Sequence, residues 1–118
     1  MSKEEINVLS NNTTENAIDE SGIFSYTLRK PKEYNGVRYE VLDFDFETLT
    51  GADAIAIETE LQTLGKAAFM PAFSSEYLVR MAAKACKQPI GADFFNLLSI
   101  TDFESVKKKA RSFLLMSE

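Results

Sequence analysis

Apolar and polar side chains alternate along residues 24–46 with the two-residue period of a half-buried β-strand. The alternating apolar residues are Phe24, Tyr26 and Leu28 in a first run and Val37, Tyr39 and Val41 in a second. Asn35 and Gly36 precede the second run, and both tolerate positive φ, which is typical of a hairpin turn. Pro31 and Lys32 end the first run, so we expect a connection longer than two residues. The pattern predicts one β-hairpin.

The second run changes phase near its centre. Its first apolar residues occupy odd positions, whereas Leu42, Phe44 and Phe46 occupy even positions. A slip of one residue moves side chains to the opposite face, so a β-bulge near Val41 and Leu42 would keep both apolar sets inward. The alternative is a strand that is buried on both faces at this point, and we favour the bulge.

A helical pattern begins after the hairpin. Thr50 is the predicted N-cap of a first helix, with Asp53 at the favourable positive end of the helix dipole. Gly65 is the expected C-cap. The apolar stripe of this helix is Ala54, Ile57, Leu61 and Leu64.

Ser74 or Ser75 is expected to cap a second helix, which runs to about Gln88 because Pro89 stops it. A short third helix is predicted over residues 92–98. The apolar side chains of the second helix that we expect to be buried are Tyr77, Leu78, Met81, Ala82 and Ala85.

Thr101 is followed three residues later by Glu104, a capping-box pattern that predicts the start of a last helix. The apolar face of this helix is Phe103, Val106, Ala110, Phe113 and Leu114. Together these patterns predict an α+β fold in which the hairpin packs on about four helices, within one domain at residues 23–118.

Charge sets the first 22 residues apart. Lys3 is opposed there by five acidic residues, which gives a net charge of −4 out of −5 for the whole chain. With few large apolar residues, the segment cannot bury enough surface to offset the entropy of ordering it, so we expect residues 1–22 to form a disordered acidic tail. The negative charge of the chain argues against a general nucleic-acid binder, which must neutralise phosphates.

The sequence favours a cytoplasmic protein that binds no membrane. No apolar run approaches the roughly 20 residues that span a bilayer, and no signal-peptide pattern opens the sequence. The single cysteine, Cys86, cannot form an internal disulfide, which suits a reducing compartment. The sequence leaves open whether the chain forms a homo-oligomer.

The residues that carry most enzyme chemistry are scarce. The chain has no histidine, and so lacks the commonest general base and the commonest metal ligand. Asp43, Asp45 and Glu47 alternate along the end of the second strand and could hold a divalent cation, but we expect a solvated face. Cys86 is expected to be a buried thiol. We therefore expect no catalytic residue, no cofactor and no metal.

Two places hold more apolar side chains than one helical stripe or one short loop can bury. Residues 67–73 form an apolar connector around Pro71, which is either packed down or exposed for a partner. Near the end of the chain, Leu115 either packs on the hairpin or marks an association surface. Residues 107–109 and Arg111 are basic, and we expect them to be the solvated face of the last helix. The candidate partner-binding residues are Phe69, Met70, Phe73, Leu115 and Met116.

The order of short motifs along residues 24–115 is more specific than any one of them. The motifs are Lys30-Pro31 and Gly36 in the hairpin, Leu49-Thr50-Gly51-Ala52-Asp53 with Glu58 and Glu60 after it, a connector with Pro71, Tyr77-Leu78-Val79 with Ala82-Ala83-Lys84-Ala85, Pro89-Ile90, Asp102-Phe103, and Val106 with Phe113-Leu114. This order resembles the phage tail assembly chaperone family of tailed phages and prophages.

The resemblance implies a non-enzymatic role in tail morphogenesis. Proteins of this family bind the long tape measure protein and help the major tail protein to assemble around it in the host cytoplasm, and they are typically absent from the finished virion. The family has no catalytic residues. Two other functions stay open: a small phage or prophage inhibitor that binds a host protein through the acidic tail, and a minor structural tail or head-completion protein.

Overall fold

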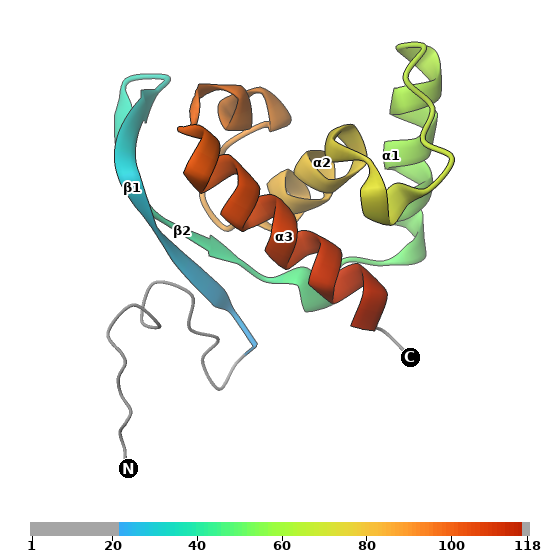
Figure 1. The fold of residues 1–118 in the computed structure, drawn as a ribbon, viewed down its shortest axis with the longest axis horizontal. Coiled ribbons are helices and arrows are strands. Elements are labelled where there is room, and N and C mark those ends of the chain that lie inside the picture. The colour runs from blue at the N-terminus through green and yellow to red at the C-terminus, as the bar shows by residue number, and fades with distance from the viewer. Residues whose placement is uncertain (1–21, 117–118) are drawn as a thin grey trace.

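The computed structural model describes residues 22–116, which form an antiparallel hairpin followed by helices (Figure 1). The elements are β1 (Phe24–Tyr34), β2 (Val37–Phe44), the 3-10 helix η2 (Phe46–Thr48), α1 (Gly51–Thr63), the 3-10 helix η3 (Pro71–Phe73), α2 (Ser75–Ala85), the 3-10 helix η4 (Ala92–Leu97) and α3 (Ile100–Met116). The predicted α+β fold is confirmed. The predicted acidic tail, except for Gly22, lies outside the described residues.

The two strands are joined by a tight two-residue turn. Asn35 and Gly36 have φ values of 52° and 80°, and Tyr34 pairs directly with Val37. Positive φ at both central residues gives the turn a twist that matches the flanking strands. The expected longer connection is therefore wrong, because β1 continues through Pro31 and Lys32 to Tyr34.

The strand pairing shifts register, but on the first strand rather than at Val41 and Leu42. Thr27 pairs with Val41 and Lys32 pairs with Tyr39, so residues 28–31 lie opposite Glu40 alone. The shift lets Tyr39 and Leu42 both face the core, whereas Val41 is 42% exposed. The predicted bulge thus falls at the right level of the hairpin but on the wrong strand. The exposure of Val41 also rules out the alternative in which the second strand is buried on both faces at this point.

Helix α1 begins and ends as predicted. The backbone N–H of Thr50 donates a hydrogen bond of 2.9 Å to Oδ2 of Asp53. At the other end Gly65 has a φ of 74°, and Lys66 N–H donates to the carbonyl of Leu61. This is the Schellman arrangement, which glycine favours because it has no Cβ. Within the predicted stripe, Ile57 and Leu61 are buried, whereas Leu64 is exposed.

Helix α2 begins at its predicted cap and ends earlier than predicted. Oγ of Ser74 accepts a hydrogen bond of 3.1 Å from the backbone N–H of Tyr77. The helix stops at Ala85 rather than near Gln88, because the chain then pairs with the end of β2. Cys86 forms an antiparallel bridge with Phe44, and Lys87 N–H donates to the carbonyl of Asp43 at 2.7 Å. All five predicted core residues of α2 are buried.

The cap of the last helix lies two residues before the predicted cap. Oγ of Ser99 accepts a hydrogen bond of 3.2 Å from the backbone N–H of Asp102, so Ser99 caps α3 and Thr101 lies within it. The predicted capping box from Thr101 to Glu104 is therefore wrong. Residues 92–97 form the predicted short helix as a 3-10 helix.

The core lies between the hairpin and the helices, which pack along one side of it (Figure 1). Aromatic rings form a continuous series across this core, from Phe24 through Phe44 and Phe46 to Phe113, with neighbouring centroids 5.4–6.0 Å apart. The series joins both strands to the C-terminal half of α3. Among the described residues, no helix is long and apolar enough to cross a membrane.

Candidate partner-binding surface

Three large apolar side chains project into solvent from the connector between α1 and α2. Phe69 is 100% exposed, Met70 63% and Phe73 61%, and we call these three residues the connector surface. Of the two alternatives for this connector, the structure therefore selects exposure. An exposed cluster of this kind is typical of a surface that binds another molecule.

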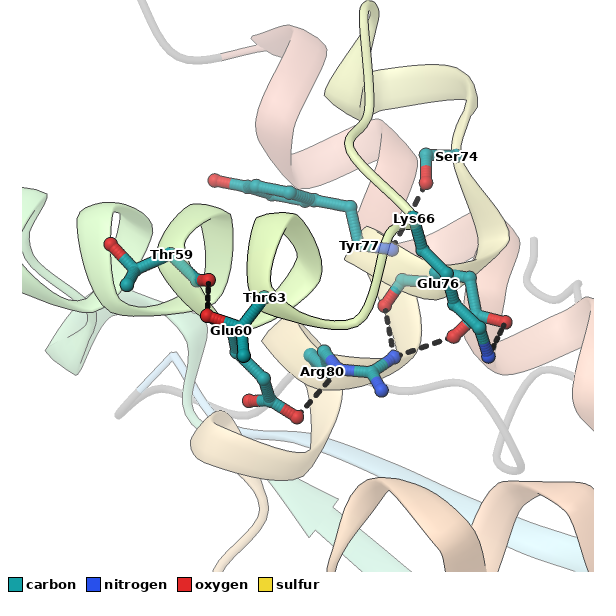
Figure 2. A network of polar contacts seen from close by, with 8 residues as sticks. All are labelled: Thr59, Glu60, Thr63, Lys66, Ser74, Glu76, Tyr77 and Arg80. Carbon is teal, nitrogen blue, oxygen red and sulfur yellow. Dashed lines mark hydrogen bonds and ion pairs between the residues drawn. The ribbon is translucent and has the colours of Figure 1, made fainter.

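Both ends of the connector are held by one network of charged side chains (Figure 2). Nε of Arg80 lies 2.9 Å from Glu60 at the end of α1, and its Nη1 lies 2.6 Å from Glu76 at the start of α2. Lys66, just before the connector, also reaches Glu76 at 3.4 Å. The hydrogen bond from Arg80 lowers the pKa of Glu76, so this carboxylate is charged at neutral pH.

Arg80 is the centre of this network because it contacts both Glu60 and Glu76. Its side chain is only 13% exposed. Burial opposes its charge, but hydrogen bonds to Glu60 and Glu76 outweigh that effect and raise the pKa of the guanidinium. A half-buried arginine with two carboxylate partners fixes geometry better than an exposed ion pair. The network therefore sets the distance between the two ends of the connector.

The connector itself is also held in place. Pro71–Phe73 forms the single turn η3, in which Phe73 N–H donates to the carbonyl of Met70 at 2.9 Å. From α3, Nε of Arg111 donates a hydrogen bond of 2.7 Å to the carbonyl of Ala72. The same guanidinium lies over the Phe73 ring, 5.4 Å from its centroid. The exposed side chains are thus presented by an ordered backbone.

A second exposed apolar pair lies at the end of α3. Leu115 is 58% exposed and Met116 71%, and we call them the α3-end surface. Leu115 therefore lies outside the core, in contrast to the alternative in which it packs on the hairpin. Because residues four apart share one helix face, Leu115 lies one turn beyond Arg111. Arg111 thus shares a face of α3 with Leu115 and also contacts the connector at Ala72 and Phe73.

The basic residues of α3 are mostly engaged with the protein. Lys107 donates to Oγ of Ser75 at 3.0 Å and pairs with Glu104 at 3.1 Å. Lys109 lies over the Phe24 ring, 5.1 Å from its centroid. The expectation of a solvated basic face holds for Lys108, which is exposed. The other three cations, including Arg111, are only partly exposed.

The sequence predicted a solvated face for the acidic row at the end of β2. In the structure this row is only partly exposed to solvent. Asp43 accepts hydrogen bonds from Oγ of Ser25 at 2.5 Å and from Nε2 of Gln88 at 2.9 Å. Within residues 22–116, Oδ1 of Asp45 is buried without a hydrogen-bond partner. Only Glu47 is exposed. The described part of the chain contains no group of three carboxylate or cysteine ligands placed to share a metal ion.

Cys86 is partly buried at the bridge between α2 and β2. Its Sγ lies 3.3 Å from Oε1 of Gln88, which also accepts a hydrogen bond from Asp43 N–H. Burial raises the pKa of the Cys86 thiol to about 11. A thiol that stays protonated at neutral pH is a poor nucleophile.

Asp102 is a buried charged residue to which the sequence patterns assigned no role. It has no solvent exposure, and it lies where α3 crosses the hairpin. The signal that could have found it is Ser99 three residues earlier, the same capping pattern shifted by two positions.

The chain matches no protein family, no curated protein and no solved structure at a level that would indicate relationship.

Proposed function

We propose that this protein is a non-enzymatic chaperone of phage tail morphogenesis, which holds apolar segments of the tape measure protein while the major tail protein assembles around it. The observation that carries the proposal is the connector surface: Phe69 is wholly exposed on an ordered loop, beside Met70 and Phe73. The order of sequence motifs, which resembles the tail assembly chaperones, supplies the identity of the client.

The chemistry of the two exposed surfaces suits a client of variable sequence. Apolar contact is non-directional, so one surface can bind many apolar side chains. Phe69 offers a large rigid contact area, while Met70 and Met116 adapt to the shape that they meet. Such a client is an amphipathic helix, whose apolar stripe would lie on the exposed side chains.

Arg111 adds a preference for acidic clients. It lies between the connector surface and Leu115, so a client helix that spans both surfaces would pass over a guanidinium. A carboxylate beside the apolar stripe of the client would be favoured at that point. Client binding in the host cytoplasm, and release before the virion is complete, follow from this role.

Complementation in the phage or prophage tests the proposal. A strain that lacks the gene should make heads without normal tails, and the wild-type gene should restore them. The double variant Phe69→Ser and Met70→Ser should fail to restore tails. Ile100→Ser is the matched control, since Ile100 is 76% exposed at the opposite end of α3.

Three results would contradict the proposal. Normal tails in the strain without the gene would remove the protein from tail assembly. Full complementation by the double variant would remove the connector surface from its function. Finding the protein in purified virions at a fixed copy number would favour a structural role instead.

A further inference from the structure

A groove of about 360 Å³ opens between the C-terminal half of α3 and the beginning of β1. Its walls are mainly apolar and include Phe24, Phe46, Phe113 and Met116. A second depression of about 280 Å³ shares Phe24, Lys109 and Ser112 with it, so the two lie side by side along α3. A volume of this size is at the lower end of the range for small-ligand sites.

The groove is mainly apolar, and the depression beside it is more basic. Lys108 and Lys109 line the second depression, whereas Glu47 is the single acidic residue among those lining either part. A suitable occupant would therefore combine one aliphatic side chain with neighbouring carboxylates.

The chain itself supplies such a segment a few residues before Gly22. Gly22 lines the groove, and residues 1–21 precede it directly in the sequence. Just before Ser21 the sequence reads Ala17-Ile18-Asp19-Glu20, an aliphatic side chain followed by two carboxylates. Ile18 is four residues from Gly22, a reach of up to about 14 Å for extended chain.

We propose that Ile18 docks in the apolar groove and that Asp19 and Glu20 lie near Lys108 and Lys109. Tethering makes such docking efficient, because a short linker holds the segment at a local concentration of about millimolar. The docked segment covers Met116 and leaves the connector surface open. It thereby competes with any partner that binds the end of α3, the proposed client helix included, although the docking itself does not rest on the proposed function.

Methyl NMR of the full-length chain tests this inference. A nitroxide spin label on Thr14→Cys, in a chain that also carries Cys86→Ala, would lie within four residues of Ile18. We expect it to broaden the methyl signal of Met116. The Met70 methyl, which lies on the connector surface, should stay sharp and serves as the internal control.

Substitutions in the segment separate docking from random contact. Ile18→Ser together with Asp19→Asn and Glu20→Gln should abolish the broadening at Met116, whereas Ile6→Ser should preserve it. The buried Met81 methyl reports that the fold is intact in each variant. No broadening at Met116, equal broadening at Met70, or broadening that survives the triple substitution would overturn the inference. Broadening transferred to an unlabelled chain in a mixed sample would also overturn it, by assigning the groove to a second copy.

Discussion

The Tyr26 hydroxyl donates a hydrogen bond of 2.7 Å to Oδ1 of Asp102, joining the first strand to the last helix across 76 residues of sequence. The same carboxylate accepts hydrogen bonds from the backbone N–H groups of Arg29 and Lys30, at 3.0 and 3.2 Å. Both N–H groups belong to residues 28–31, where the register of the hairpin shifts. Asp102 therefore supplies acceptors for backbone donors that the register shift takes out of the regular ladder.

Asp102→Ala should be among the most destabilising single substitutions in this protein. It removes the acceptor for three donors inside the fold, and we expect a loss of about 3 kcal/mol in the free energy of unfolding. Tyr26→Phe removes one of the three hydrogen bonds and should cost about 1.5 kcal/mol. Urea unfolding followed by circular dichroism measures both. A loss below about 1 kcal/mol for Asp102→Ala would show that water replaces the carboxylate.

Stability should fall in acid partly through the same residue. Burial opposes the charge of Asp102, but hydrogen bonds from Arg29 N–H, the Tyr26 hydroxyl and Lys30 N–H outweigh it, so the pKa is lowered from its ordinary value of 3.8. A lowered pKa in the folded state contributes stability that is complete above the ordinary pKa and is lost as the pH falls through the lowered one. The stability difference between wild type and Asp102→Asn should therefore shrink in acid. A difference that stays constant with pH would contradict this assignment.

Two glycines should respond in opposite directions to alanine. Gly36 has a φ of 80° in the hairpin turn, a conformation that disfavours a Cβ, so Gly36→Ala should cost about 1 kcal/mol. Gly51 opens α1 with open space around it, and Gly51→Ala should stabilise by about 0.5 kcal/mol. Thermal unfolding of the two variants, compared with wild type, checks the pair. Equal changes in melting temperature for the two variants would contradict the positive φ of Gly36 in the hairpin turn.

Cys86 should react slowly in the folded protein. Burial raises the pKa of its thiol from 9.0 to about 11, which lowers the thiolate fraction at neutral pH by about 100-fold. Because it is the only cysteine, a chromogenic disulfide reagent reports on it alone. Modification at neutral pH should be at least that much slower in native protein than in urea. Similar rates in both conditions would place the thiol in solvent.

Local sequence signals predicted the local structure well. Asn35 and Gly36 indicated the turn, and Thr50, Gly65 and Ser74 indicated helix ends that the structure confirms. Each of these residues acts on backbone groups within a few positions of itself, so its effect can be read from neighbouring residues alone.

Two features that the sequence did not predict depend on contacts between distant segments. The register shift is stabilised by Asp102, and α2 ends early because Cys86 pairs with Phe44 on β2. For the candidate surface, the sequence indicated an excess of apolar residues in the connector without deciding between burial and exposure. That choice depends on Arg80 and Arg111, which hold the connector from α2 and α3.

Co-purification with the tape measure protein tests the central claim most directly. The protein would be co-expressed with the tagged tape measure protein from the same phage or prophage, and the amount retained per tag would be quantified. We expect retention of the wild type and of Ile100→Ser. Phe69→Ser with Met70→Ser should lower retention about tenfold or more, as for contact residues at the centre of an interface.

The structure predicts that these variants stay folded, because the substituted side chains lie outside the core. An unchanged melting temperature for the Phe69→Ser and Met70→Ser variant, together with lost retention, is the result that the proposed function requires. Retention equal to wild type, both in that variant and in Leu115→Ser with Met116→Ser, would contradict it.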